Sequence, residues 1–65
     1  MTDEEREKLF NNYIDLLKKS GFNLFTPFRA SGIFDCSESN ARYVLDKAIK
    51  RGLLEIEQKG VYRWK

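Results

Sequence analysis

The sequence predicts an α+β domain that is mostly helical, with three helices followed by a two-stranded β-hairpin. Three observations support this prediction: apolar residues recur at helical spacing in two stretches, capping residues mark the helix ends, and the C-terminal segment alternates between apolar and charged residues around a glycine. The chain has 65 residues, of which 42% are hydrophobic and 14% aromatic. That length and composition fit one folded domain, residues 1–65, with a small core.

The composition excludes several kinds of site. The one cysteine cannot form an internal disulfide, and without histidine a zinc site lacks its usual ligands. No paired carboxylates and no glycine-rich phosphate loop occur, so we expect no enzyme activity, no metal and no cofactor. No apolar run approaches the roughly 20 residues needed to cross a bilayer, and the N-terminus is acidic. We therefore expect a protein of a reducing compartment, either cytoplasmic and nucleoid-associated or nuclear, that does not act on membranes.

Charge is unevenly distributed along the chain, whose net charge is +2. Residues 1–20 hold five acidic and four basic residues and carry −1, whereas residues 21–65 hold five acidic and eight basic residues and carry +3. The basic excess in the C-terminal part favours an anionic partner, with a solvated basic surface as the alternative explanation.

Residues 3–19 are predicted to form the first helix. Thr2 and Glu5 have capping-box spacing, since the Thr2 hydroxyl can accept from the Glu5 N–H. Lys18 and Gly21 suit the C-terminal end. The helix carries a broad apolar face that we expect to pack in the core, although part of it could instead pair with a second copy of the chain. The members of that face are Leu9, Phe10, Tyr13, Leu16 and Leu17, with Ile14 at the edge.

A short connector leads to a brief second helix. Residues 22–25 are aromatic and only weakly alternating, which indicates an extended connector or a very short strand. Thr26 at the N-cap and Pro27 at the first helical position open a helix of about one turn. We expect residues 32–36 to form a turn whose two large apolar side chains point inward.

The third helix, about residues 38–51, is the best-defined element. Ser37 is a good N-cap, and Gly52 can adopt the left-handed conformation that ends a helix. One side carries apolar residues at i, i+3, i+4 and i+7 and must face the core, while the other alternates polar, aromatic and basic residues and is available to solvent or a partner. The apolar residues are Ala41, Val44, Leu45 and Ala48, with Ile49 at the margin; the outward residues are Ser39, Arg42, Tyr43, Asp46, Lys47 and Lys50.

Residues 54–64 are predicted to form the hairpin, and side-chain chemistry favours one register. A two-residue loop of Lys59 and Gly60 would mix apolar and charged residues on each face. A three-residue loop with Gly60 in the left-handed conformation instead pairs apolar with apolar and acidic with basic residues. The resulting pairs are Leu54 with Trp64, Glu55 with Arg63 and Ile56 with Tyr62. We expect the four apolar residues of these pairs to pack on the helices, with the charged pair outside.

In this order of elements the chain resembles a winged helix-turn-helix domain over nearly its whole length. The residues that carry the resemblance are Phe25-Thr26, Ser31-Gly32-Ile33, residues 37–45 and the Gly52-Leu53-Leu54 entry to the wing. The turn at residues 32–36 looks longer than is usual in this family, and the wing tip, residues 58–60, is short. The resemblance implies a DNA-binding protein, a small transcriptional regulator that binds double-stranded DNA as a dimer.

If the family's usual mode applies, the third helix lies in the major groove and the wing touches the DNA backbone. Asn40 can then form two hydrogen bonds with adenine, and Arg42 two with guanine. Ser39 and Tyr43 can contact bases or phosphates. The predicted phosphate contacts are Thr26, Lys47, Lys50, Lys59 and Arg63.

Several of these residues also have simpler structural interpretations. Arg42 and Asp46 are four residues apart on a helix and could pair with each other. Glu38 and Asp46 lie beside the predicted contact face and would repel phosphates, although Glu38 could accept from a cytosine amino group. Cys36 precedes a helix N-terminus, a position that can make thiols reactive, but without a histidine base we expect a small buried residue.

Two other functions stay open at this stage. The chain could be a winged-helix module that binds another protein within a replication, repair or transcription complex, or it could bind RNA. DNA affinity that falls steeply with salt and is lost in Arg42→Ala would favour DNA binding, whereas a protein that ignores duplex DNA at low salt would favour a protein partner. A homodimer would have to use the first helix or the chain ends.

Overall fold

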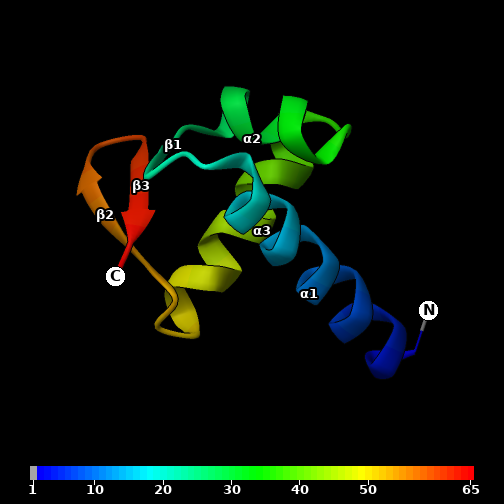
Figure 1. Cartoon of the computed structure of the whole chain (residues 1–65). Coiled ribbons are helices and arrows are strands. Elements are labelled where there is room, and N and C mark those ends of the chain that lie inside the picture. Colours follow the sequence, from blue (N-terminus) through cyan, green and yellow to red (C-terminus); the bar gives the residue numbers. More distant parts are fainter. Residues whose placement is uncertain (1) are drawn as a thin grey trace.

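The computed structural model describes residues 2–65 and contains three helices and a small antiparallel sheet (Figure 1). The fold is α+β and mostly helical, as predicted. In chain order the elements are α1 (Asp3–Ser20), β1 (Leu24–Phe25), α2 (Pro27–Phe34), α3 (Glu38–Lys50), β2 (Leu54–Gln58) and β3 (Val61–Trp64). The N-terminal half of α1 and the hairpin of β2 and β3 project from opposite ends of the molecule in Figure 1.

α1 begins where the sequence predicts, but its buried face is narrower. The Thr2 hydroxyl accepts from the Glu5 N–H at 3.2 Å. Ile14 lies at the centre of the buried face, not at its edge, while Leu9 and Leu16 are each 40% exposed. The buried residues of α1 are Phe10, Ile14 and Leu17. This central strip meets the rest of the core, and the half-buried Tyr13 packs beside it.

α2 is longer than predicted, and the turn after it is shorter. The helix continues through Gly32, which the sequence analysis placed in a turn. A glycine inside a helix costs about 0.5–1 kcal/mol relative to alanine, but here the continued helix buries Phe34, which is 6% exposed. Asp35 then adopts φ 55° and ends the helix. Residues 35–37 alone form the turn, a length usual between two such helices, so the prediction of a long turn was wrong.

α3 supplies the centre of the core. The hydroxyl of Ser37 accepts from the Asn40 N–H at 3.2 Å, and Gly52 has φ 77°, so both predicted ends are confirmed. The four predicted apolar positions are each 4% exposed or less: Ala41, Val44, Leu45 and Ala48. Residues from every other element complete the core around them: Phe10, Ile14, Leu17, Phe25, Ala30, Phe34, Leu54 and Tyr62.

The three strands form one antiparallel sheet in the order β1-β3-β2. The predicted hairpin therefore gains a third strand from the connector, where Leu24 pairs with Arg63 and Phe25 with Tyr62. The hairpin has the predicted register, with Leu54 opposite Trp64, Glu55 opposite Arg63 and Ile56 opposite Tyr62. Gly60 has φ 79°, the left-handed conformation that the turn requires.

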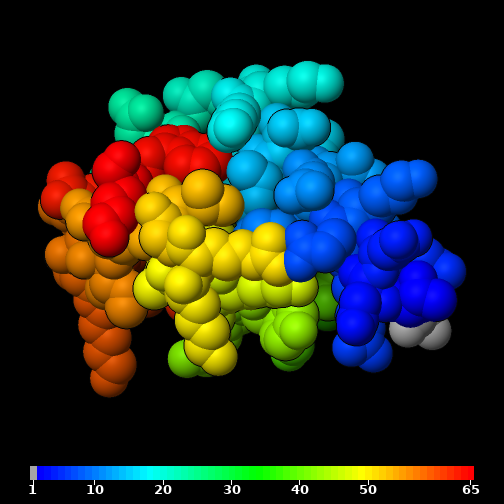
Figure 2. Space-filling model, turned by 90° about the horizontal axis from the view of Figure 1, so that it is seen from below, coloured from blue at the N-terminus to red at the C-terminus, as the bar shows by residue number. Residues whose placement is uncertain are grey.

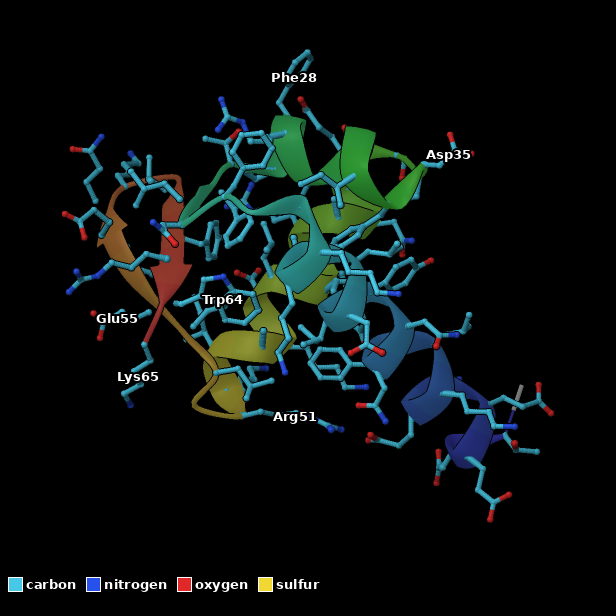
Figure 3. The ribbon with its side chains drawn as sticks, in the orientation of Figure 1. Phe28, Asp35, Arg51, Glu55, Trp64 and Lys65 are labelled. Atoms are coloured by element: carbon cyan, nitrogen blue, oxygen red, sulfur yellow. The ribbon has the colours of Figure 1, made fainter. Side chains whose placement is uncertain are left out.

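Two details of the hairpin differ from the prediction. The loop has two residues, Lys59 and Gly60, and not the predicted three, because Gln58 pairs with Val61. The ladder is irregular between Ile56 and Gln58, so an extra residue bulges out of β2 near the tip and the predicted pairs still form. Ile56, predicted to pack on the helices, is 61% exposed, whereas its partner Tyr62 is 6% exposed. At this distance from the base of the hairpin the long tyrosine side chain reaches α3, but the shorter isoleucine does not. Nearer the base, Trp64 packs edge-on against Phe25, with ring centres 5.7 Å apart (Figure 3).

Candidate nucleic-acid interface

The outward side of α3 carries most of the predicted DNA contacts. Five of them are exposed: Ser39, Asn40, Arg42, Tyr43 and Lys50. The Tyr43 side chain is 64% exposed, as the sequence predicts. Lys47 is half-buried, and its ammonium lies 5.2 Å from the centre of the Phe10 ring of α1, a cation–π distance.

These side chains divide into two flanks of α3. Successive residues of a helix are turned by about 100°, so Asn40 and Arg42 point in nearly opposite directions around the axis. One flank faces the hairpin and the other faces α1. We call Arg42 and Asp46 the hairpin flank, and Asn40, Tyr43 and Lys47 the α1 flank, with Ser39 and Lys50 between them.

The hairpin flank is joined to the sheet by a hydrogen bond. The Tyr62 hydroxyl of β3 donates to Asp46 Oδ1 at 2.8 Å. Burial raises the pKa of the Tyr62 hydroxyl, the bond to Asp46 raises it further, and the nearby Arg42 opposes the shift. Asp46 therefore bonds the sheet, and within residues 2–65 no ion pair forms between it and Arg42. Arg42 is exposed and lies close enough to the Tyr62 hydroxyl to act on its pKa.

The α1 flank borders a groove between α3 and α1, with a volume of about 350 Å³. The lining residues are Arg6, Leu9, Phe10 and Tyr13 of α1 and Asn40, Tyr43, Val44 and Lys47 of α3. Three of the predicted DNA contacts therefore share one surface with the first helix. The sequence did not predict that these three residues would lie beside α1.

An ion pair joins the two helices beside this groove. The guanidinium of Arg51, the residue after α3, points toward α1 and binds both carboxylate oxygens of Glu7 (Figure 3). Arg51 Cζ also lies 4.6 Å from the centre of the Phe10 ring. The hydrogen bond lowers the pKa of Glu7 and raises that of Arg51. Because both side chains are exposed to solvent, the pair orients α1 against α3 more than it stabilises the fold.

The turn of the hairpin lies on the same side of the molecule as the outer part of α3. Lys59 is exposed at the turn. Figure 2 shows the orange turn between β2 and β3 and the yellow-green part of α3 reaching the same lower edge of the molecule. One extended partner can therefore contact both elements.

Two predicted contacts already have partners within the protein. Arg63 forms ion pairs with Glu55 and with Glu57, the latter from Nε to Oε2 at 2.9 Å. Its charge is thus compensated at the hairpin, away from α3. The Thr26 oxygen accepts from the Arg29 N–H at 3.1 Å as the N-cap of α2, so its hydroxyl proton is still available to donate.

Cys36 lies in the turn between α2 and α3. Its side chain is half-buried, not fully buried as predicted, and Sγ donates to the Ser37 carbonyl at 3.4 Å. This contact lies within the turn between α2 and α3, where a small side chain packs against the core.

The contributions of α1 and Tyr62 to this region were not predicted from the sequence. Arg6, Leu9, Phe10 and Tyr13 have the i, i+3, i+4, i+7 spacing of one helix face. That spacing was visible in the sequence, but three apolar members made it look like an ordinary core face. The bond between Tyr62 and Asp46 depends on how the hairpin folds back over α3, which no local pattern specifies.

No family model, no curated protein and no solved structure matches the chain. In the part of the chain that the structure describes, no helix is long and apolar enough to cross a membrane. No group of three potential metal ligands occurs within residues 2–65 either.

Proposed function

We propose that this protein binds double-stranded DNA as a winged helix-turn-helix module, acting as a small transcriptional regulator. α3 lies in the major groove, and the short turn at residues 58–60 lies on the backbone. The observation that carries the proposal is the exposed outer side of α3, which holds Arg42, Tyr43 and Lys50. It lies on the same side of the molecule as the turn between β2 and β3 (Figure 2). An α-helix about 10–12 Å across fits the major groove of B-DNA.

Arg42 is the strongest candidate for a base contact. Its side chain is exposed, it forms no ion pair within the described residues, and it lies beside the hydrogen bond that fixes the hairpin. A guanidinium fork matches the two acceptors of guanine in the major groove. Ser39 and Asn40 lie in the first turn of α3, the end that reaches base edges in recognition helices.

Phosphate contacts supply affinity in this proposal. Lys50 and Lys59 are exposed, and Lys47 is half-buried over Phe10. Glu38, at the start of α3, opposes them. Single DNA-binding modules bury only about 600–1,000 Å², so two copies on adjacent half-sites are part of the proposal.

A salt titration of DNA binding tests this function. The anisotropy of a labelled mixed-sequence duplex is measured against protein concentration at several salt concentrations. If about four Lys and Arg side chains contact the DNA, the logarithm of the binding constant falls with the logarithm of the salt concentration at a slope of about −3 to −4.

Two lysine variants make the titration specific. Lys50→Gln reduces the slope by about one, whereas Lys18→Gln, the same change in α1, leaves it unchanged. Absence of binding at the lowest salt, or equal slopes for the two variants, would overturn the proposal.

One observation favours a second candidate function, that of a protein-interaction module. Phe28 of α2 is 77% exposed and points away from the rest of the molecule (Figure 3). Phe22 and Leu24 are 43% and 47% exposed, and Arg29 lies 4.4 Å from the centre of the Phe22 ring. Under this alternative the protein ignores duplex DNA at low salt. Phe28→Ala then abolishes binding to the protein partner, and Arg42→Ala does not.

A further inference from the structure

α1 exposes two leucines on the side of the helix that faces away from its buried strip. Leu9 and Leu16 are each 40% exposed, and neither belongs to the core cluster. They are seven residues apart, which is close to two helical turns, so they lie in line along the helix. Asn12, which lies between them, is also exposed. A single exposed leucine is ordinary, but two in line give a second helix something apolar to cover.

Two charged residues extend this line toward both ends of α1. Glu5 lies four residues before Leu9, and Lys19 lies three residues after Leu16. The line therefore advances in alternating steps of four and three residues, the spacing by which two helices pair. All five residues are exposed. We call them the outer seam: Glu5, Leu9, Asn12, Leu16 and Lys19.

The outer seam is complementary to its own reverse. Turned end for end about Asn12, it sets Leu9 against Leu16 of a second copy and Glu5 against Lys19 of that copy. Each of these pairs then occurs twice, because a two-fold contact repeats every pair. The two Asn12 amides meet at the axis, where each has both a donor and an acceptor to offer the other.

The residues that flank the outer seam agree with the same arrangement. Lys8 and Asp15 are exposed, lie seven residues apart on one flank, and face each other across a reversed pair of helices. Arg6, Tyr13 and Ser20 follow at seven-residue steps on the other flank, where Arg6 and Tyr13 line the groove toward α3. On that flank Arg6 faces Ser20 of the second copy, so no like charges are opposed.

The charge along α1 favours antiparallel over parallel pairing. Residues 3–8 hold four acidic and two basic residues and carry −2, whereas residues 15–20 hold one acidic and two basic residues and carry +1. Glu7, one of the four acids, is already bonded by Arg51, so the first segment offers −1 to a second copy. Antiparallel helices set this charge against +1, whereas parallel helices set each segment against its own like charge.

The shape of the molecule leaves room for such a pair. α1 has 18 residues and is about 27 Å long, and its N-terminal half projects from the rest of the molecule (Figure 1). Residues 3–8 contribute none of the buried residues of the helix, the first of which is Phe10. A second α1 lying alongside covers this projecting half, which the protein's own core does not.

We propose that two copies of this protein pair through α1, with the helices antiparallel and the outer seams in contact. A two-fold axis that reverses the two helices keeps their groove flanks on one side of the pair, so both α3 helices lie on that side. One consequence rests on the proposed function: the two α3 helices can then engage neighbouring half-sites of one duplex. The pairing itself needs no DNA.

The contact is a single pair of helices and is expected to be weak. It covers less than the about 1,200 Å² that stable interfaces bury, so we expect a Kd of about 0.1 mM. At micromolar concentration, as in unfolding measurements, the protein is then mostly monomeric. Binding to adjacent half-sites raises the local concentration of the second copy and favours the pair.

Sedimentation equilibrium of the protein alone, from about 10 µM to about 1 mM at low salt, tests the pairing. The wild type should pass from monomer to dimer over this range. Leu16→Ala should weaken the dimer by about tenfold or more, because it removes apolar surface from the centre of the seam in both copies. Leu53→Ala, the same change at a leucine that is 38% exposed after α3, should leave the dimer unchanged.

Two neighbouring lysines test the antiparallel orientation. Lys19→Glu sets a second acid against Glu5 and should weaken the dimer about five- to tenfold, since the change acts twice in a two-fold pair. Lys18→Glu makes the same change one residue away, about 100° around the helix and off the seam, and should have little effect. Adding Glu5→Lys to Lys19→Glu should restore dimerisation. Unchanged amide spectra at low concentration show that each variant still folds.

A protein that stays monomeric at about 1 mM would overturn the pairing. Equal effects of the Lys18 and Lys19 variants, or no recovery in the double variant, would overturn it as well. Because no DNA is present, such a failure leaves DNA binding by single modules standing. A dimer that ignores duplex DNA would instead overturn the proposed function and leave the pairing intact.

Discussion

The two flanks of α3 carry similar numbers of polar side chains but differ in how they are held. On the hairpin flank, Tyr62 reaches back from β3 and bonds Asp46, so the sheet fixes this side of the helix. On the α1 flank, Lys47 only covers the Phe10 ring, and the groove between α1 and α3 stays open. A packed flank restricts the geometry of the side chains beside it, whereas an open flank leaves its side chains accessible. The difference comes from what packs beside α3, since both flanks belong to one continuous helix.

The largest effect is expected from a change that removes the support of both flanks. Leu45 is 0% exposed and lies on the buried stripe of α3. Leu45→Ala should lower the free energy of unfolding by about 2–5 kcal/mol, measured by urea or thermal unfolding. Leu53, which is 38% exposed, provides the matched control, and Leu53→Ala should cost under about 1 kcal/mol. Similar losses for the two variants would mean that α3 is not the centre of the core.

DNA affinity should depend most on the hairpin flank. Arg42→Ala should weaken binding by about 1–3 kcal/mol, roughly five- to 150-fold, in an anisotropy titration at low salt. Arg63→Ala removes the same charge from a side chain already paired with Glu55 and Glu57, so affinity should change less than about twofold. A larger loss for Arg63→Ala than for Arg42→Ala would contradict the assignment of the contact face.

The bond that fixes the hairpin flank should contribute measurably to stability. Tyr62→Phe removes only the hydroxyl that donates to Asp46 and should cost about 1 kcal/mol, whereas the same change at the exposed Tyr43 should be close to neutral. The folded protein has a raised Tyr62 pKa, so it favours the neutral phenol. The stabilisation that the Tyr62 hydroxyl gives the folded protein is therefore fully present below the ordinary pKa of 10.0 and is lost as pH rises above that value.

Unfolding of the wild type and of Tyr62→Phe at pH values on both sides of 10 checks this sign. The difference in the free energy of unfolding between the wild type and Tyr62→Phe should shrink as pH rises. A gap that stays constant would show that the hydroxyl does not form this bond in solution.

The smallest effect is expected from Glu7→Gln, which removes the ion pair beside the α1 flank. The pair with Arg51 is exposed, so the variant should lose only a little thermal stability at neutral pH. The pKa of Glu7 is lowered in the folded protein, so the pair stabilises the fold above the ordinary pKa of 4.5 and stops doing so as pH falls below it. The difference in Tm between wild type and variant should therefore vanish in acid. Asp15→Gln is a suitable control on the exposed surface of α1, and an effect at Asp15 as large as that at Glu7 would argue against the pair.

The element order and most helix ends could be predicted because they depend on local chemistry. The caps at Thr2, Thr26 and Ser37 each accept the hydrogen bond expected of them. The hairpin register followed from pairing apolar and charged residues, and that pairing is found. The length of α2 could not be predicted in the same way, since the burial of Phe34 outweighs the helix-breaking tendency of Gly32.

The candidate site was predictable only in part. Periodicity correctly placed Arg42, Tyr43 and Lys50 on the outward side of α3. It could not show that Lys47 would lie over an α1 ring or that Arg63 would be taken up by two glutamates, because these contacts depend on how separate elements pack. Ile56 shows the same limit. Its strand partner Tyr62 has a side chain long enough to reach α3, whereas the Ile56 side chain is too short to do so.

The measurement that tests the DNA-binding account most directly is the amide spectrum of ¹⁵N-labelled protein with a mixed-sequence duplex at low salt. Binding through α3 and the hairpin turn predicts shifts concentrated at residues 39–50 and around Lys59, and predicts that they fade as salt is added. A spectrum that does not change would contradict the account. Shifts confined to Phe22, Leu24 and Phe28 would equally contradict it, since DNA would then be contacting a surface that α3 does not form.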